Sequence, residues 1–583
     1  MRFTTSEMEI RKVCLILCFL NALTSSKKKF AQTYGKNRDI NHDLCLNLSL
    51  SPIQTLQMGR RARSYAGEIK SETFNLTDIS AYFRYRKEVE GDNLLSDQTY
   101  SDLGVEELFT FADRTVSRVG QQYLYQTLRS VPQAAGEISR HEEIIRHLQA
   151  DSHLRERLAK TLSHLRDTEA YSIVRLLADE QPAASTNRKV TFAILKCLPA
   201  LFLLLYLLLH IPACGLFFLV AIILNAGIHY TYKPKSIDYI YSVPQLIKLL
   251  GTAEKLCKIP ELSKLATDIP DALATLKPIR KTALFLRMEN KLQSDMAALA
   301  WLCTELLHIF FLTEPFSFLQ SVSILRNKCR EIETVYRFVG LTDCLLSVCF
   351  LREHLPYYCL PGIPEERHRL ASQEMYHPLI EDCIANSIDI QDRSVLLNGS
   401  NMSGKTTFIR IIGINVLSAQ TLHTAFARSF LLATPLNIYS ALMLADDLSE
   451  GKSFYMKEVD TIKEMISRNQ KGTANLFLFD EIFKGTNTTE RIAAAKAVLS
   501  YLNTHDNIIV ASTHDTELAT LLDKEYDLYH FSEVIEGETF FFDYKLKNGP
   551  LYQRNAIRLL EINGFPPIVI RDAYQTIEGM TKQ

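Results

Sequence analysis

The chain has no long tract rich in glycine, serine or proline, no low-complexity segment and almost no net charge. The first two absences exclude a fibrous or largely disordered protein, and 47% hydrophobic residues indicate a folded one. The formal charge of -1 means that no global positive field draws the chain to nucleic acid, although a local basic patch would suffice. Because the chain has 583 residues, we expect two or three domains.

Cysteine pairs at metal-binding spacing are also missing. The twelve cysteines are scattered, without a CxxC pair or a Cys/His cluster at zinc-ligand spacing. Outside the N-terminal apolar run, the closest pair is Cys344 and Cys349. We therefore expect buried, reduced thiols and a reducing compartment.

The first 70 residues carry no clear structural pattern. Residues 13–24 are apolar, and twelve residues are too few to span a bilayer but fit the core of a signal peptide. No small-x-small cleavage site follows, residues 27–63 are basic and patternless, and Met58 is an alternative start. We interpret residues 1–70 as an uncertain leader and favour a misassigned start or a disordered leader over a working signal.

One long apolar stretch, residues 190–228, is sufficient for two bilayer crossings at about 1.5 Å per residue. His210-Ile211-Pro212 interrupts it, and basic residues flank both ends, which predicts a tight hairpin with both ends on the cytoplasmic side. Lys196 lies close enough to one end to snorkel. A buried hairpin in a soluble core is the alternative, but the near absence of polar residues favours a transmembrane helical hairpin at 190–229 in the cytoplasmic membrane.

Helical periodicity dominates on both sides of this hairpin. Residues 71–180 and 240–355 have apolar residues at three- and four-residue spacing and few glycines, so we predict helical regions at 71–189 and 230–370. From residue 389, short β-rich runs (SVLLNG, ANLFLFDE, NIIVAST and ETFFFDYKL) alternate with helices. This alternation predicts a largely parallel sheet with helices on both faces. We therefore predict a multi-domain protein in which a mostly helical region, interrupted by the hairpin, precedes an α/β domain at 371–583.

Residues 399–406 (GSNMSGKT) match the phosphate-loop pattern GxxxxGK[ST] at every fixed position. A β-rich run precedes them and a helical run follows, so backbone N–H groups and a helix N-terminus would face the phosphates. Lys405 is expected to reach the β and γ phosphates, and Thr406 to ligate Mg²⁺. The candidate nucleotide-binding residues are Gly399, Ser400, Asn401, Met402, Ser403, Gly404, Lys405, Thr406 and Thr407.

Two further strand ends carry polar residues that suit a phosphate-loop ATPase. Residues 476–479 are apolar and lead to Asp480, which would join the magnesium shell, and Glu481, which would polarise the attacking water. His514 follows another apolar run and would act near the γ-phosphate, although a structural role is the alternative. We therefore predict an ATP hydrolase with catalytic Glu481, Lys405 and His514, and with Mg²⁺ held by Thr406 and Asp480.

The amino-acid sequences of these motifs resemble those of the MutS DNA mismatch-repair family. The phosphate loop is similar to that of the family, with Ser400 in place of a usual proline. The other similar segments are Tyr-His-Pro at 376–378, ADDLSEGKSFYMKEV at 445–459, DEIFKGTNTTE at 480–490, STHDTEL at 512–518 and the closing run at 549–573. The resemblance implies an ABC-type ATPase domain in a homodimer, where Ser453 of one subunit reaches the nucleotide bound by the other. Phe454 stands where a threonine is usual.

The resemblance continues more weakly upstream and then stops. Residues 108–129, with their Asp-Arg-Thr, resemble the opening of the family's core domain, so the helical region would correspond to core and lever helices. The first hundred residues contain no Phe-x-Glu, the mark of the family's mismatch-binding domain. The hairpin also interrupts the region that a mismatch sensor uses to clamp DNA. We therefore do not expect mismatch recognition.

Two functions remain open at this point. The leading hypothesis is a membrane-tethered MutS-like ATPase whose cycle opens and closes helical arms on a partner, with DNA as one candidate. The alternative is the ATPase engine of a membrane scaffold or transporter-like assembly with no nucleic-acid partner. The LSGGQ signature of transporters is absent, and two crossings are too few for a substrate path in one chain.

Overall fold

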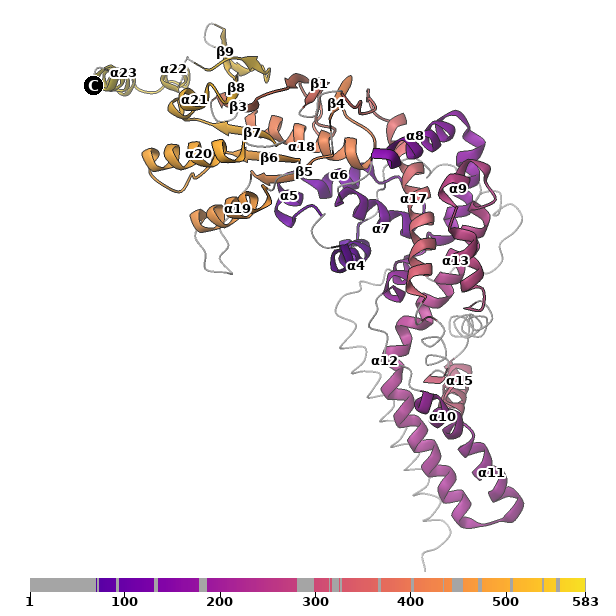
Figure 1. Cartoon of the computed structure of the whole chain (residues 1–583). Coiled ribbons are helices and arrows are strands. Elements are labelled where there is room, and N and C mark those ends of the chain that lie inside the picture. Colours follow the sequence, from indigo (N-terminus) through magenta and orange to yellow (C-terminus); the bar gives the residue numbers. More distant parts are fainter. Residues whose placement is uncertain are drawn as a thin grey trace, which may run out of the picture. The chain divides into compact units, whose positions relative to one another are not determined.

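A computed structural model gives the fold of most of the chain (Figure 1). It describes residues 70, 73–90, 94–130, 135–177, 186–279, 298–313, 315–316, 325, 328–364, 369–399, 403–433, 435–442, 454–469, 474–503, 507–536, 539–551 and 556–581. The predicted leader at 1–70 falls outside this part of the chain except for Lys70. Ser400, Asn401, Met402 and Ser453 also lie outside the described residues.

The helical region packs around one long helix, α17 (Cys329–Glu353). Its partners include α7 (Arg118–Leu128), α8 (Ala135–Ala150), α9 (Ser152–Leu162) and α13 (Ile269–Leu276). The other helices of this region are α3 (Leu76–Ile79), α4 (Ala81–Glu90), α5 (Asp97–Asp102), α6 (Val105–Ala112), η2 (Ser163–Leu165), η3 (Thr168–Leu176) and η4 (Pro260–Leu265). By length and composition α17 could cross a membrane, but 83% of its apolar 18-residue stretch is buried inside the protein. Its apolar surface is therefore a protein core.

Asp343 of α17 anchors the start of α7. Its carboxylate accepts the backbone N–H groups of Val116 and Ser117 at 2.9 and 2.7 Å. Burial raises the pKa of Asp343 to about 6, against the lowering effect of these hydrogen bonds. A Cβ at Gly120 would lie 2.1 Å from Asp343 Oδ2, so only glycine fits there. This contact gives a physical reason for the glycine that follows Asp-Arg-Thr in the sequence.

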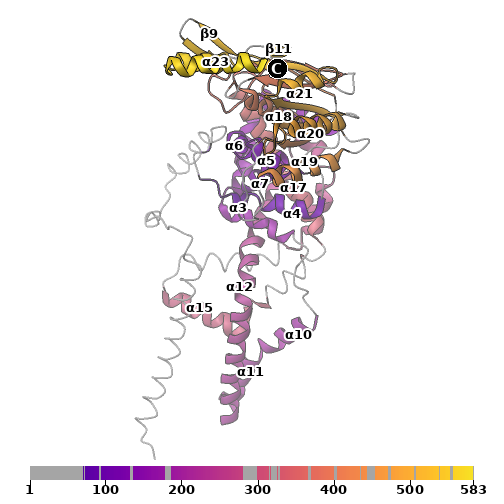
Figure 2. The same ribbon diagram turned by 90° about the vertical axis from the view of Figure 1, so that its left-hand side faces the viewer.

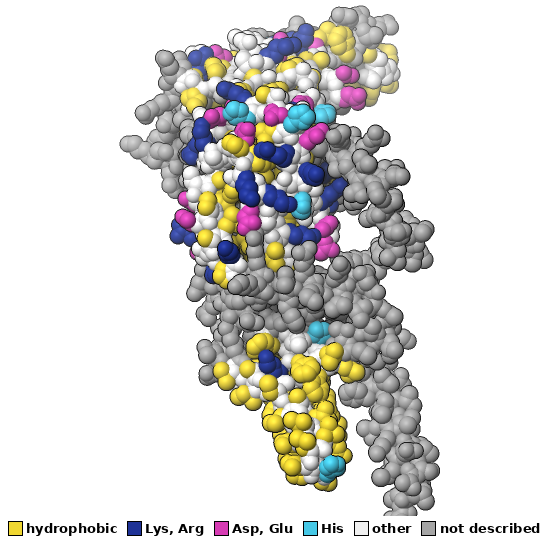
Figure 3. Space-filling view, turned by 90° about the vertical axis from the view of Figure 1, so that its right-hand side faces the viewer, with side chains coloured by type: hydrophobic (Ala, Val, Ile, Leu, Met, Phe, Trp, Pro, Cys, Tyr) yellow, Lys and Arg dark blue, Asp and Glu magenta, His cyan; other side chains and the backbone are white. Residues whose placement is uncertain are grey.

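The predicted hairpin forms as helices α10 (Thr186–Leu195), α11 (Leu198–Leu209) and α12 (Pro212–Leu256). His210, in the left-handed conformation with φ 52°, makes the turn between α11 and α12. Residues Val190–Leu209 and Pro212–Tyr232 are each long and apolar enough to cross a membrane. Only 11% and 17%, respectively, of the apolar 18-residue stretch within each is buried. Figure 3 shows hydrophobic side chains covering the visible face of the hairpin toward its turn. α12 continues past the expected boundary at residue 229 without a break.

The C-terminal region contains a six-stranded sheet in the order β11-β8-β3-β7-β6-β5. Its strands are β3 (Ser394–Gly399), β5 (Asn437–Ala441), β6 (Asn475–Asp480), β7 (Ile508–Thr513), β8 (Tyr526–Phe531) and β11 (Lys547–Asn548). All neighbouring pairs are parallel except β11 with β8. The first three predicted runs coincide with β3, β6 and β7. The fourth supplies β10 (Thr539–Phe542), which pairs with β9 (Glu533–Glu536) in a separate two-stranded sheet.

Helices cover both faces of the six-stranded sheet (Figures 1 and 2). Along β6, Leu476 and Leu478 join the core that contains α18 (Lys405–Thr421), whereas Phe477 and Phe479 join the opposite core. That second core receives side chains from α19 (Phe454–Arg468), α20 (Thr488–Leu502) and α21 (Thr516–Leu522). Successive residues of a strand point to opposite faces, so a continuous apolar run suits a sheet buried on both sides.

A small sheet and two helices make up the other described elements of the C-terminal region. β1 (Leu370–Met375) pairs with β2 (Asn386–Ile390) and β4 (Ser429–Leu432) in an antiparallel sheet. The chain then ends in α22 (Ala556–Ile562) and α23 (Pro567–Thr581).

Candidate active site

The predicted site residues that the structure describes lie at the carboxyl edge of the parallel sheet. β3 ends at Gly399, β6 at Asp480 and β7 at Thr513, and these three strands lie side by side in register. Parallel strands bring their carboxyl ends to one edge, which is where open α/β sheets bind ligands. The order of the motifs along the chain therefore becomes a cluster in space.

Lys405 is the first residue of α18, and its side chain is buried. Its ammonium donates to the carbonyl of Gly399 at 2.7 Å. Burial lowers the pKa of Lys405 to about 8, although Glu481 and Asp480 act in the opposite direction. Ser403 beside it is buried, and Thr407 is half-buried on α18.

Two glycines shape the loop around Lys405. Gly404 has φ 103°, a conformation that L side chains rarely adopt. A Cβ at Gly399 would lie 2.5 Å from the carbonyl oxygen of Phe531, so the backbone of β8 approaches too closely for any other residue. These are the fixed glycines of the loop pattern, and both are required by the fold itself.

Thr406 and Asp480 are joined directly. The Thr406 hydroxyl donates to Asp480 Oδ2 at 2.7 Å, and the Ser512 hydroxyl donates to the other carboxylate oxygen. Hydroxyl and carboxylate oxygens are the hard donors that Mg²⁺ prefers. Ser512, which sequence reasoning did not single out, holds the Asp480 carboxylate in place from β7.

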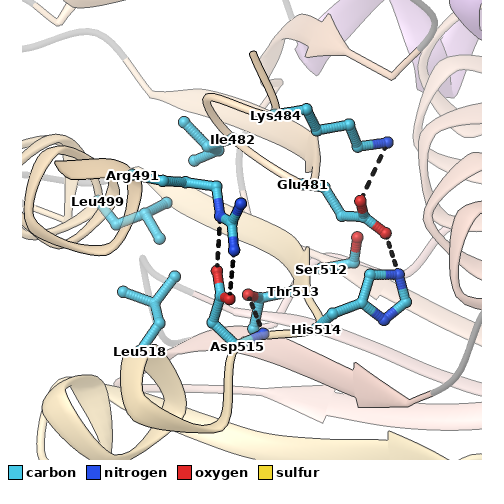
Figure 4. A pocket seen from close by; sticks show the side chains of 10 residues that line it. All are labelled: Glu481, Ile482, Lys484, Arg491, Leu499, Ser512, Thr513, His514, Asp515 and Leu518. Atoms are coloured by element: carbon cyan, nitrogen blue, oxygen red, sulfur yellow. Dashed lines mark hydrogen bonds and ion pairs between the residues drawn. The ribbon is translucent and has the colours of Figure 1, made fainter. Parts of the chain in front are cut away.

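Glu481 sits at a strained turn immediately after β6, with φ 57°. Its N–H donates to the carbonyl of Ser512 at 3.2 Å, and its carboxylate contacts His514 Nε2 and Lys484 Nζ, the latter at 3.3 Å (Figure 4). His514 Nδ1 lies 2.8 Å from the carbonyl oxygen of Gly399. His514 therefore bridges the end of β3 and the Glu481 carboxylate.

Partial burial raises the pKa of Glu481, but the hydrogen bond and positive charge of His514, together with Lys484, outweigh it. The net result is a pKa below the usual range of a glutamate. Glu481 is therefore an ionised carboxylate at neutral pH, fixed on both oxygens.

A pocket of about 270 Å³ opens beside Glu481 (Figure 4). Its lining residues are Glu481, Ile482, Lys484, Arg491, Leu499, Ser512, Thr513, His514, Asp515 and Leu518. Arg491 of α20 binds Asp515 through two hydrogen bonds of 3.0 and 2.7 Å. Sequence reasoning missed this pair, although Asp515 lies inside the segment 512–518 and Arg491 directly follows the segment 480–490.

Glu458 of α19 is a further residue that the sequence did not reveal as part of the site. It is buried, and its carboxylate accepts the N–H of Phe483 at 2.5 Å. Phe483 has φ 61° and follows Glu481 by two residues. Glu458, the acid of FYMKEV, thereby holds the turn that carries Glu481. Burial raises the pKa of Glu458.

We expect Glu458→Ala to lower the free energy of unfolding by about 1–3 kcal/mol, because the buried N–H of Phe483 loses its acceptor. Thermal unfolding of the purified full-length chain measures this effect. Glu464→Ala is the matched control, since Glu464 lies on the same helix, is exposed, and faces Arg468 at 3.9 Å. Equal unfolding midpoints for the two variants would contradict the role of Glu458.

Tyr544 brings an aromatic ring to the phosphate loop from the far end of the chain. A Cβ at Gly404 would lie 3.1 Å from Tyr544 Cδ1. Asn386 fixes this segment, since its side chain donates to the carbonyl of Tyr544 at 2.9 Å and accepts the N–H of Leu546 at 2.8 Å. No local pattern in the sequence distinguishes Tyr544.

Comparison with known proteins locates the family relationship in the same region. A family model described as MutS domain V matches residues 395–581. The DNA mismatch repair protein MutS of Listeria monocytogenes is 28% identical over 270 residues, which cover 44% of this chain and 31% of that protein. Its counterpart in Halalkalibacterium halodurans is 30% identical over 270 residues, covering 44% and 30%.

The protein of the same name from Lactobacillus delbrueckii subsp. bulgaricus is 30% identical over 236 residues, which cover 38% of this chain and 27% of that protein. The chain thus spans less than a third of the length of these relatives. The similarity is concentrated where the candidate site lies. Residues 395–581 are therefore similar to domain V of the MutS family.

Proposed function

We propose that this protein is a phosphate-loop ATP hydrolase, tethered to the cytoplasmic membrane by the hairpin at 190–229, that works as a homodimer. The observation that carries this proposal is the meeting of Lys405, the Thr406–Asp480 pair and the Glu481–His514 pair at one sheet edge. Each group lies beside one of the strands β3, β6 and β7. Phosphoryl transfer requires chiefly such positioning and charge stabilisation.

Lys405 and the start of α18 are the proposed phosphate-binding elements. The ammonium of Lys405 is held against a backbone carbonyl, and its lowered pKa indicates that its surroundings do not fully compensate its charge. Phosphate oxygens would supply that compensation, together with the N-terminal N–H groups of α18. The described loop residues Gly399, Gly404 and Thr407 belong to the same proposed cradle.

The Thr406 hydroxyl and the Asp480 carboxylate fit a magnesium site, because two hard oxygen donors lie together and a nucleotide would complete the shell. When bound there, Mg²⁺ would neutralise charge on the transferred phosphate. Ser512 keeps the carboxylate oriented from the neighbouring strand.

Glu481 is the proposed water-activating residue. Its lowered pKa makes it a weak proton acceptor, so it would orient and polarise a water more than remove a proton early. His514 fixes the carboxylate of Glu481 and at the same time contacts Gly399 at the loop. We propose that His514 senses the phosphate end of the nucleotide through this bridge.

Binding of ATP should weaken as the pH rises above about 8, by up to about tenfold per pH unit. The sign follows from Lys405, whose pKa of about 8 lies below its ordinary value of 10.5. Above pH 8 the free site holds a neutral amine, while phosphate binding favours the ammonium, so binding takes up a proton. Titration calorimetry at pH 7 and pH 9, in two buffers of different ionisation enthalpy, measures both quantities. Equal affinity and no proton uptake at pH 9 would exclude this role of Lys405.

Tyr544 is the proposed contact for the nucleobase. Its ring is partly exposed and lies against Gly404, at the phosphate loop. An aromatic face in this position offers a stacking surface for a purine.

The proposed homodimer rests on the family relationship and on an uncovered apolar face. On α23, Tyr574 and Ile577 are exposed and lie three residues apart, so they share one face of the helix. Ser453, which the resemblance assigns to the nucleotide of the other subunit, lies outside the described residues. A second copy of the chain would cover apolar residues that water now contacts.

DNA is the first partner to test for the helical region, because the relatives are named for DNA mismatch repair. The ATPase rate of the detergent-solubilised protein should be measured with homoduplex, mismatched and branched DNA, at low and moderate salt. Stimulation by one form, weakened by salt, would support a DNA-structure sensor at the membrane. Robust hydrolysis indifferent to every DNA would favour the alternative, an engine for a membrane scaffold or transporter-like assembly.

A further inference from the structure

We propose that α15 (Ala298–Phe311) is a re-entrant membrane helix, which enters the bilayer beside the hairpin and turns back without crossing it. This inference rests on the proposed membrane insertion of the hairpin. The described part of α15 ends at the level of the candidate span Pro212–Tyr232, and the chain turns back there, so α15 does not cross the bilayer.

The contacts with α12 fix the direction of α15. Glu305 Oε1 lies 3.2 Å from His229 Nε2. The carbonyl oxygen of Phe310 accepts a hydrogen bond from Asn225 Nδ2 at 3.1 Å. The rings of Phe310 and Phe218 lie 6.2 Å apart. Residue numbers rise along α15 while they fall along α12, so the two helices are antiparallel. The C-terminal end of α15 thus points toward the turn before Pro212 and lies within the candidate span Pro212–Tyr232.

The chain turns back directly after α15. Leu312 adopts the left-handed conformation with φ 47°, and its carbonyl accepts the N–H of Phe316 at 3.1 Å. Phe316 packs against a small buried cluster around Phe192 of α10. The ammonium of Lys196 lies 4.3 Å from the centre of the Phe316 ring, so the charge inside the hairpin meets an aromatic face. The chain after α15 therefore returns to the end of the hairpin opposite its turn, where α10 packs on α12.

Among the α15 residues whose side chains are described, two polar residues are buried and three apolar residues are exposed. Glu305 and His308 are buried, whereas Leu306, Leu307 and Phe311 are 56%, 57% and 41% exposed. This division is the one expected of a helix beside lipid, where ionisable side chains face protein. The exposed side chains continue the apolar surface of the hairpin, so acyl chains are the occupant that we assign to this face.

Asn225 supplies the hydrogen bond that a helix end needs in lipid. Backbone carbonyls at a helix C-terminus have no partner within the helix, and hydrocarbon offers none. The fully buried side-chain amide of Asn225 donates to the Phe310 carbonyl at 3.1 Å and to the carbonyl of Leu195, at the end of α10, at 3.4 Å. One residue of α12 thereby caps two helices that end at the same level.

The chain's single tryptophan, Trp301, makes a direct test possible. In a Trp301→Phe background, one tryptophan is introduced as Phe311→Trp in α15, Phe217→Trp in α12 or Tyr501→Trp in α20, all exposed positions. Each full-length chain is reconstituted into phosphatidylcholine vesicles with brominated acyl chains. We expect the bromines to quench Trp at 311 to within about twofold of Trp at 217. The fluorescence of Trp at 501 should be quenched only by iodide dissolved in the aqueous phase.

The possible outcomes separate this inference from the proposed hairpin. If Trp at 217 is quenched by bromine and Trp at 311 only by iodide, α15 lies outside the bilayer while the hairpin stands. If neither is quenched by bromine, the proposed hairpin insertion itself fails, and the re-entrant helix with it. Asn225→Leu, added to the Phe311→Trp chain, should reduce bromine quenching at 311, because the capped end loses its donor. Unchanged quenching would overturn the capping role of Asn225.

Discussion

Glu481→Gln should lower the rate of ATP hydrolysis by about 10²–10⁴-fold while ATP binding stays close to that of the wild type. The glutamine keeps the shape of the side chain but removes the negative charge that faces His514 and Lys484. A neutral amide polarises water far less than a carboxylate does. Lys405, Thr406 and Asp480, the proposed phosphate and magnesium contacts, remain intact. Steady-state phosphate release and equilibrium nucleotide binding by the purified full-length chain measure the two quantities.

Glu517→Gln is the matched control for this substitution. Glu517 lies on α21, close in sequence to His514, but it is exposed and does not line the pocket. This variant should hydrolyse ATP at the wild-type rate. Wild-type turnover by Glu481→Gln would remove Glu481 from the mechanism, and loss of binding would show that it serves the nucleotide pocket instead.

The second large effect concerns the membrane. Leu204→Arg combined with Leu224→Arg should release the chain from membranes, because each arginine costs about 2.5–3.5 kcal/mol at the centre of a membrane helix. The two leucines are 53% and 54% exposed and lie on opposite arms of the hairpin. Partitioning of the full-length chain between the membrane pellet and the supernatant after alkaline carbonate extraction measures the effect.

Leu521→Arg controls for the added charge, because Leu521 on α21 is also 54% exposed but lies far along the chain from the hairpin. This variant should stay in the pellet with the wild type. In detergent, the double hairpin variant should keep the thermal midpoint of the wild type, since neither leucine is buried. A double variant that remains integral to the membrane, or one that unfolds, would favour the alternative of a hairpin buried against protein.

Local patterns were sufficient to predict the strands of the candidate site. The apolar run before Asp480 and the fixed glycines at 399 and 404 carry signals within a few residues of one another. The structure then places Lys405, Asp480, Glu481 and His514 together, because parallel strands align their carboxyl ends. The hairpin turn at His210 could also be predicted from the sequence, because a proline follows two residues later in an otherwise apolar run.

Long-range contacts carry the parts that the sequence did not reveal. Tyr544 reaches the phosphate loop from 140 residues away, and its position depends on Asn386, which lies in another sheet. Glu458 holds the turn after β6 from a separate helix. Such contacts depend on how the elements pack, and no spacing rule encodes them.

Apolar periodicity also fails to distinguish a protein core from lipid. α17 and the hairpin helices both meet the length and hydropathy of a membrane span, yet α17 is enclosed by other helices. α12 likewise passes through residue 229 without a break, because its later residues, such as Leu246 and Leu250, join the helical core. Only the three-dimensional surroundings of each helix show that the apolar surface of α17 is buried and that of the hairpin is exposed.

The most direct test of the central claim is phosphate release from ATP by the detergent-solubilised full-length chain, with Mg²⁺ and with excess chelator. Lys405→Ala is prepared in parallel as the variant without the proposed phosphate contact. We expect steady hydrolysis by the wild type, and we expect both the chelator and Lys405→Ala to abolish it. Absence of hydrolysis in the wild type, or full activity in Lys405→Ala, would contradict the central claim.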